Sequence, residues 1–148
     1  MLAGEAKALH TTKRSSGIDV SDPALAEAWA LVRQDSEPQP NWCAFTHAEG
    51  SNQVIRLLGS GSGGLTELCS ALKEDVVAFC ALRVPDAGQH AKSPQFHRIL
   101  FVGEEVGGMK RGRAALQKNA VFAVFDNVSA QDFEFKSLSE LSEAPTLS

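Results

Sequence analysis

Three glycines in the segment "VIRLLGSGSGGLTELCSAL" (54–72) form the most specific chemical pattern in this sequence. Gly59, Gly61 and Gly64 satisfy the spacing G-x-G-x-x-G, which in nucleotide-binding proteins brings backbone amides against a pyrophosphate. An apolar run precedes them, a helical pattern follows, and Asp86 comes after the next apolar run, at about the distance of a ribose-binding carboxylate. The segment therefore raises the hypothesis of a small nucleotide-binding enzyme that uses loop 59–64.

The order of the neighbouring elements argues against that hypothesis. A nucleotide-binding α/β domain continues as strand, helix, strand, with crossovers of a dozen or more residues. Here the next two strands, predicted at 76–84 and 96–102, are joined by a loop with two prolines and a glycine, which suits an antiparallel pair. A hairpin is also predicted before the glycines, from strands at 42–47 and 53–58. We therefore predict a mixed sheet in which the glycines only turn the chain, and keep the nucleotide-binding enzyme as the alternative of another class.

The other reactive side chains form no recognisable catalytic or metal-binding arrangement. The histidines and cysteines lack the spacings of zinc ligands, and no G-x-S-x-G elbow surrounds a serine. The odd number of cysteines and the absence of C-x-x-C indicate free thiols in a reducing cytosol. We expect a protein that is not an enzyme and that takes no cofactor and no metal. The residues concerned are His10, His47, His90, His97, Cys43, Cys69 and Cys80.

Composition limits the size of the fold and the class of partner. With 148 residues, 43% hydrophobic and 22% charged, the chain suits one globular domain. A net charge of -4 argues against a nucleic-acid binder. No apolar run approaches the roughly 20 residues of a spanning helix, and the first residues lack the apolar region of a signal peptide. We expect a monomeric cytoplasmic protein that binds neither nucleic acid nor membrane.

Periodicity and capping residues place the elements that would position a site. Residues 1–20 are polar and aperiodic and predict a flexible tail, followed by a domain at 21–142 and a disordered tail at 143–148. Asp22 and Pro23 suit the N-cap and first turn of a helix. The remaining predicted elements are a helix at 65–72, a basic strand at 109–115, a segment at 116–127 that fits strand or helix, a strand at 132–136, and helical turns in "SLSELSE".

Several segments come in a diagnostic order: a helix ending "ALVRQD", the hairpin, "GSGSGGLTELCSALKEDVVAFCALRV" and "FHRILFVGEEVGGMKRGRAA". The most specific pieces are the glycine turn with L-x-E-L, the acidic residue before "VVAF", the Arg83–Val84 pair, and the strand ending in aromatic-x-Gly-Glu. Over about residues 20–142 the chain resembles the coactosin branch of the actin-depolymerising-factor (ADF/cofilin) homology family. The resemblance implies an α/β fold, a mixed sheet of five or six strands with helices on both faces, in which 116–127 is the long third helix.

The resemblance also implies non-catalytic binding to actin filaments and regulation of actin dynamics at the cytoskeleton. In the family, the contacts come from basic residues leading into the long helix, from the helix's exposed face, and from the loop before the preceding strand. The matching residues of the first two groups are Lys110, Arg111, Arg113 and Lys118. Cations suit this role because actin's surface is acidic, and an acidic protein needs a local positive patch to meet it.

Phe122 is a further candidate on the long helix. If the segment is helical, Phe122 lies off the face formed by Leu116, Ala120 and Val124. An exposed aromatic at that position would suit a partner, and packing against the last strand is the alternative.

The sequence departs from the family at the loop before the fourth strand. Coactosins typically carry a lysine just before the phenylalanine that opens this strand, and here the position is Gln95. The nearest cations are Lys92 and Arg98, which we take as candidates for the same surface. Binding to actin monomers, or to the actin-related branching complex, remains the alternative within the fold.

Overall fold

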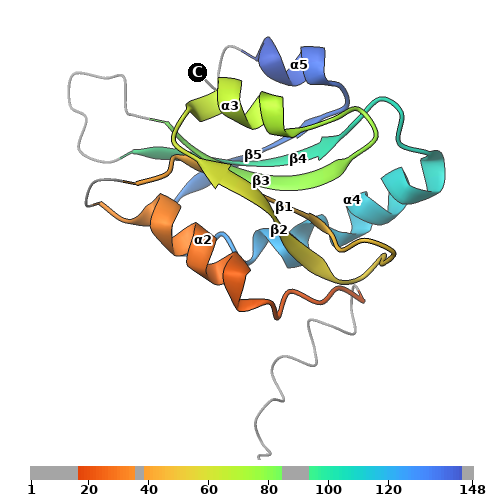
Figure 1. The fold of residues 1–148 in the computed structure, drawn as a ribbon, viewed down its shortest axis with the longest axis horizontal. Helices are drawn as coiled ribbons and strands as arrows, with labels where there is room; N and C mark the ends of the chain where they lie inside the picture. Colours follow the sequence, from red (N-terminus) through yellow and green to blue (C-terminus); the bar gives the residue numbers. More distant parts are fainter. Residues whose placement is uncertain (1–16, 36–38, 85–93, 145–148) are drawn as a thin grey trace, which may run out of the picture.

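The computed structural model describes residues 17–35, 39–84 and 94–144, which form a sheet with helices on both faces (Figure 1). The sheet has five strands in the order β2-β1-β3-β4-β5, so the predicted fold class is confirmed. The strands are β1 (Trp42–His47), β2 (Ile55–Gly61), β3 (Val77–Val84), β4 (Gln95–Val102) and β5 (Ala130–Phe135). The helices are α2 (Pro23–Arg33), α3 (Gly64–Ala71), α4 (Gly108–Phe122) and α5 (Leu138–Ser142).

The sheet is mixed because one pair of strands is parallel. β1 pairs antiparallel with β2 and with β3, and β3 pairs antiparallel with β4, as the loop between these two strands predicted. β4 and β5 are parallel. A parallel pair requires a crossover of a dozen or more residues, and α4 provides it.

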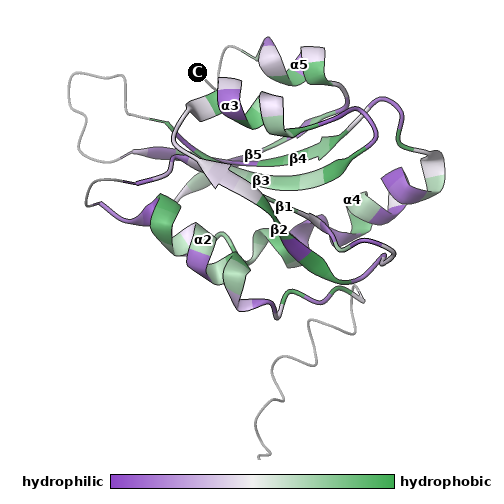
Figure 2. Ribbon diagram, viewed as in Figure 1, coloured by the Kyte–Doolittle hydropathy of each residue, from purple (hydrophilic) through white to green (hydrophobic). Residues whose placement is uncertain are grey.

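Two separate cores lie on the two faces of the sheet, because successive strand residues point to opposite sides. α2 and α4 cover one face, and α3 and α5 cover the other (Figure 1). In β3, Val77 and Phe79 pack toward α2 and α4, whereas Ala78 and Cys80 pack toward α3 and α5. β3 is buried on both faces, as its continuous apolar run predicted, and Figure 2 shows the central strands as hydrophobic.

Local signals fix the start of α2. The Asp22 carboxylate accepts a hydrogen bond from the Ala24 N–H at 2.9 Å, and Pro23 stands in the first turn, where no N–H is needed. The capping prediction for this helix is therefore confirmed. Within the described residues, no helix is long and apolar enough to cross a membrane.

The predicted basic strand at 109–115 is wrong, because these residues form the first turns of the 15-residue helix α4. Gly108 and Gly112 lower the local helix propensity, which obscured this in the sequence. Burial of Ala114 and Gln117, one helical turn apart, fixes the helix against the sheet instead. Residues 116–127 are helical only as far as Phe122.

Candidate functional site

The outward face of α4 is the surface with the most exposed apolar side chains. Met109 and Leu116 are each 81% exposed, compared with 49% for Leu31 and 41% for Val54, the other exposed large hydrophobic residues of the described chain. Seven residues separate them, so they lie on the same side of the helix and about 10.5 Å apart along its axis. Apolar side chains held in water at this spacing favour contact with a protein partner.

Cations lie beside Met109 and Leu116, which together we call the apolar ridge. Lys110 and Arg113 lie in the first two turns of α4, and Lys118 follows two turns after Arg111. Lys110, Arg113 and Lys118 take no part in the ion pairs among the described residues. Those ion pairs involve Arg33, Arg83 and Arg98 instead. The charges of Lys110, Arg113 and Lys118 are therefore available to a partner. Figure 2 shows this early part of α4 as hydrophilic.

Arg111 has a different role from its basic neighbours. Its Nη2 donates to the carbonyl oxygens of Gly103 at 3.0 Å and Val106 at 3.3 Å, and the side chain is half-buried. It thereby holds the loop between β4 and α4. The sequence groups Arg111 with Arg113, whereas the structure separates a side chain that binds the loop from one that does not.

Glu74 holds the same loop from the opposite side. Its carboxylate accepts hydrogen bonds from the backbone N–H of Glu104 at 2.9 Å and of Leu138 at 3.0 Å. Its carbonyl accepts from the N–H of Glu105 at 2.8 Å. The backbone of Gly103 lies so close to the backbone of Glu74 that a Cβ would overlap it. The approach to α4 is therefore fixed by the turn before β3 and by the start of α5.

Beneath the ridge, α4 is joined to the β1–β2 hairpin by Gln117. This side chain is 2% exposed, and its Nε2 donates to the carbonyl of Asn52 at 2.8 Å. Its Oε1 therefore faces Nε2 of His47, also at 2.8 Å, and this histidine nitrogen must carry the proton. Burial lowers the pKa of His47, and the charges of Lys110 and Arg113 lower it further, against the effect of the Gln117 hydrogen bond. His47 is accordingly neutral in the folded protein at pH 7.

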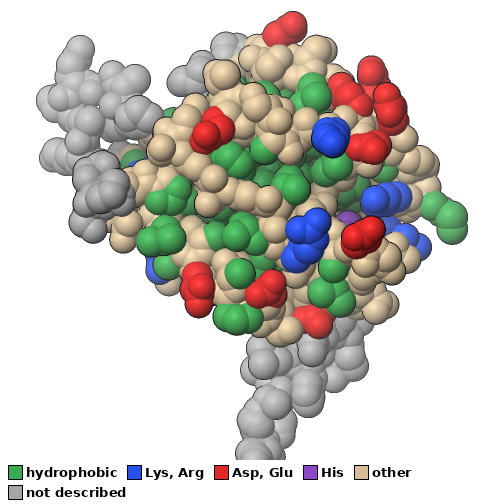
Figure 3. Space-filling view, in the orientation of Figure 1, with side chains coloured by type: hydrophobic (Ala, Val, Ile, Leu, Met, Phe, Trp, Pro, Cys, Tyr) green, Lys and Arg blue, Asp and Glu red, His purple; other side chains and the backbone are tan. Residues whose placement is uncertain are grey.

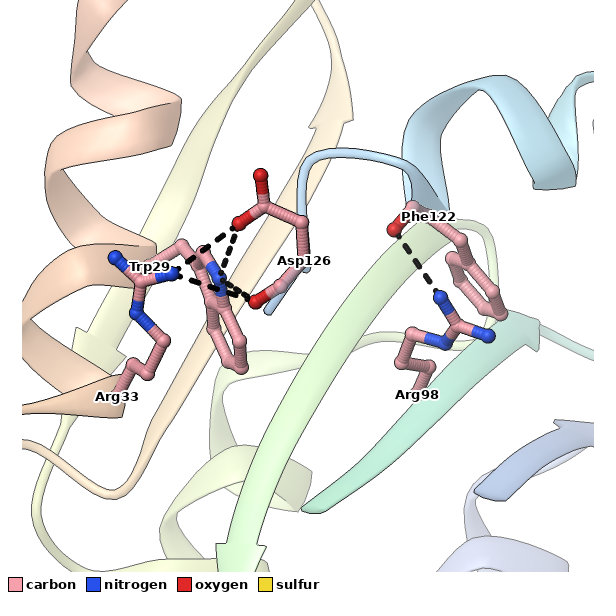
Figure 4. A network of polar contacts seen from close by, with 5 residues as sticks. All are labelled: Trp29, Arg33, Arg98, Phe122 and Asp126. Atoms are coloured by element: carbon pink, nitrogen blue, oxygen red, sulfur yellow. Dashed lines mark hydrogen bonds and ion pairs between the residues drawn. The ribbon is translucent and has the colours of Figure 1, made fainter. Parts of the chain in front are cut away.

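The expectation that Phe122 is exposed is wrong. The ring is 2% exposed and packs in the core with Phe125, because the helix turns its Gln117 and Val121 face toward the sheet. Arg98 is also engaged: its guanidinium lies 5.4 Å from the centre of the Phe122 ring and donates to the Phe122 carbonyl (Figure 4). The same guanidinium forms a two-pronged ion pair with Asp132.

The segment that follows α4 is bound to α2. The Trp29 Nε1–H donates to the Asp126 carbonyl at 3.1 Å, and Arg33 pairs with the Asp126 carboxylate at 3.4 Å (Figure 4). Side chains at this end serve internal contacts, so the accessible cations and apolar residues of α4 lie between Met109 and Lys118.

The structure does not bring Gln95 to this surface. Gln95 is exposed at the beginning of β4, opposite Val84, whereas α4 is reached from the other end of that strand. The eight residues from Gln95 to Val102 extend over about 23 Å, seven steps along the strand. Lys92, the other candidate from the loop before β4, lies outside the described residues, so only the position of Gln95 can be compared with the surface on α4.

The glycine segment binds a carboxylate of this chain. Glu67 Oε1 accepts from the Gly63 N–H at 2.9 Å and from Trp42 Nε1–H at 2.8 Å, and these bonds lower the pKa of Glu67. Gly64 adopts φ = +67° where α3 begins, a conformation that favours glycine. Glu67 therefore occupies an amide that a phosphate would need. Gly64 turns the chain as predicted, whereas Gly59 and Gly61 lie within β2 and pair with Ala44 and Trp42 of β1.

The thiols and the metal-binding side chains give no further site in the described part of the chain. Burial raises the pKa of Cys43 to about 12 and raises the pKa values of Cys80 and Cys69, so all three favour the protonated, unreactive form at pH 7. Within residues 17–35, 39–84 and 94–144, no group of three or more His, Cys, Asp or Glu could hold a metal ion. The residues that the sequence did not single out are Met109 and Leu116, whose exposure became visible only from the orientation of α4.

Comparisons with known proteins agree with this fold. Residues 17–148 match the family model described as cofilin/tropomyosin-type actin-binding protein. The chain is 34% identical to coactosin of Dictyostelium discoideum over 114 residues, 76% of each protein. It is 38% identical to the drebrin-like protein of Mus musculus over 95 residues, which are 63% of this chain and 20% of that protein.

Solved structures give the same grouping. Coactosin from Entamoeba histolytica superposes with a TM-score of 0.73 at 28% identity, covering 85% of this chain and 88% of that one. Human coactosin-like protein superposes with a TM-score of 0.73 at 25% identity, covering 85% and 92%. A mixed five-stranded sheet, a matching family model and coactosin relatives in both sequence and structure lead to one conclusion: the chain belongs to the cofilin/tropomyosin-type actin-binding protein family, in its coactosin branch.

Proposed function

We propose that this chain is a non-catalytic actin-filament-binding protein that contacts the filament through the outward face of α4 from Met109 to Leu116. The observation that carries the proposal is the pairing of Met109 and Leu116, both 81% exposed, with Lys110 and Arg113, which take part in no ion pair among the described residues. The apolar ridge would be buried in the contact, and the cations would meet the acidic surface of actin. Family membership supports actin as the partner.

The division of roles within the basic segment follows from the side-chain contacts. Lys110 and Arg113 are proposed as contact residues, and Lys118, half-exposed on α4, as a peripheral one. Arg111 would act by holding the loop before α4, since its guanidinium donates to two loop carbonyls. Phe122 lies in the core, and Arg98 is bound to Phe122 and to Asp132, so we assign both to the support of the helix.

The test is co-sedimentation with filamentous actin. Exchanging Met109 and Leu116 for alanine should reduce the bound fraction severalfold, because exposed apolar side chains contribute to binding only when a partner covers them. Leu31→Ala is the matched control: this leucine is 49% exposed but lies on α2. Binding of the paired variant at the parent level would refute the proposed surface. Retention of monomeric actin without sedimentation would instead favour the monomer-binding alternative.

The non-catalytic assignment has its own test. Glu67 occupies the Gly63 amide within the glycine segment, so we expect no binding of ATP or NAD by calorimetry. A micromolar dissociation constant for either nucleotide would contradict the assignment.

A further inference from the structure

A hollow of about 460 Å³ lies between the start of α4 and the β1–β2 hairpin, beside the proposed contact surface. Lys110 lines it from α4, Arg56 from the edge strand β2 and His47 from the end of β1. Figure 3 shows basic and acidic side chains gathered around a histidine on this face. The hollow thus joins two elements that are more than 50 residues apart in the sequence.

Arg56, which lines this hollow, makes only weak contacts with the described residues of the chain. The residue is exposed, and among the residues that the structure describes it donates one hydrogen bond, at 3.3 Å, to the carbonyl of its neighbour Leu57. It has no part in the three ion pairs of the described residues. The guanidinium of Arg111 holds a loop, whereas the contacts of Arg56 with the described residues do not join it to another element.

The charge around the hollow is divided. Glu49 and Asp75 line it as well, so its total charge is close to zero. Burial lowers the pKa of His47, and the charges of Lys110 and Arg113 lower it further, so these two cations lie near the histidine that lines the hollow. An acidic group of a partner would be attracted by Lys110 and Arg56 and repelled by Glu49 and Asp75.

We propose that the contact surface extends from α4 across this hollow to β2, and that Arg56 binds an acidic side chain of the partner together with Lys110. This inference rests on the proposed function, since it takes actin's acidic surface as the partner. The extension adds one contact residue, Arg56, which lies on β2 and outside both the basic segment and the long helix.

The experiment measures filament affinity of Arg56→Ala by co-sedimentation at low and at physiological salt. We expect a loss of about threefold to fivefold at low salt, because an exposed charge pair contributes up to about 1 kcal/mol, and a smaller loss at physiological salt because of screening. Arg56→Lys should keep most of the affinity. Lys136→Ala is the matched control: it removes the same charge just after β5, at the opposite edge of the sheet.

Two further variants make the test specific. Glu49→Gln removes a carboxylate from the same hollow and should tighten binding, the opposite sign from Arg56→Ala. The losses of Arg56→Ala and Lys110→Ala should be non-additive in the double variant if both side chains meet one acidic group.

The outcomes separate the two proposals. A parent protein that does not bind filaments overturns the proposed function and this extension of it. A parent that binds, with Arg56→Ala at parent affinity, overturns the extension alone. Equal losses for Arg56→Ala and Lys136→Ala would also overturn it, since they would show an effect of net charge. Unfolding curves matching the parent confirm that each variant is folded.

Discussion

Arg111 and Arg113 lie two residues apart, and their exchange for alanine should have different consequences for stability. We expect Arg111→Ala to lower the free energy of unfolding and Arg113→Ala to leave it nearly unchanged. The reason is the difference in their contacts: Arg111 donates to the carbonyls of Gly103 and Val106, whereas Arg113 takes part in no ion pair among the described residues. The prediction tests whether the basic segment has one role or two.

The magnitude follows from the two hydrogen bonds. A bond from a charged donor contributes about 1.5–3 kcal/mol when well formed. The bond to Gly103 is 3.0 Å long, the bond to Val106 is longer at 3.3 Å, and the side chain is only half-buried. We therefore expect Arg111→Ala to cost about 2 kcal/mol in total, or a fall in melting temperature of roughly 5–10 °C. Arg113→Ala should stay within about 0.5 kcal/mol of the parent.

Urea unfolding monitored by circular dichroism measures the difference, with filament co-sedimentation of the same variants alongside. Arg113→Ala should be stable but bind weakly, whereas Arg111→Ala should be less stable. Arg111→Lys, which keeps the charge but not the two-carbonyl geometry, should recover only part of the stability. Equal unfolding midpoints for Arg111→Ala and Arg113→Ala would refute the assignment of Arg111 to the loop.

Other contacts give predictions of the same kind. Glu74→Gln should cost about 1 kcal/mol in urea unfolding, because an amide nitrogen would face one of two backbone N–H donors that the carboxylate now accepts from. Gly103→Ala should cost at least 1–3 kcal/mol, because its Cβ would overlap the Glu74 backbone, and a parent-like melting curve would contradict this. Burial lowers the pKa of His97, so below about pH 6.5 the unfolded chain binds more protons than the folded one and stability falls as the pH falls through the lowered value. His97→Leu should therefore weaken the pH dependence of the unfolding free energy between pH 7 and 5. Part of that dependence should remain in the variant, because burial lowers the pKa of His47 as well. Gln95→Lys should tighten filament binding at low salt if the start of β4 also faces actin, and unchanged affinity at every salt concentration would exclude it.

The parts of the fold that the sequence predicts well are those with local causes. β1 has the predicted bounds, Trp42–His47, because a short apolar run between turn residues is typical of a strand. α2 begins where Asp22 and Pro23 indicate, because capping depends on neighbouring residues alone. The antiparallel pairing of β3 and β4 followed from the loop between them, which has the wrong residues for a crossover helix.

The helix through the basic segment depends on tertiary contacts as well as on local preference. Residues 109–115 are good helix formers except for Gly112, and this glycine, with Gly107 and Gly108 before the segment, obscures the helical preference. The turn at Glu74 and the guanidinium of Arg111 fix the loop before them, and Gln117 fixes the helix that they begin. These partners lie up to 65 residues away in the sequence, so no window around the segment contains them.

The orientation of α4 contradicts the hydrophobic pattern, and the contradiction itself points to function. By hydrophobicity, Leu116 belongs in the core and Gln117 in water, but Leu116 is 81% exposed and Gln117 is 2% exposed. The buried amide is tolerated because His47 and Asn52 satisfy its hydrogen bonds, so the helix can turn an apolar residue outward. A partner that covers Leu116 and Met109 would bury the apolar surface that folding leaves in water. Places where local preference and observed packing disagree are expected at functional surfaces, and here the disagreement lies on the helix that also carries the unpaired cations.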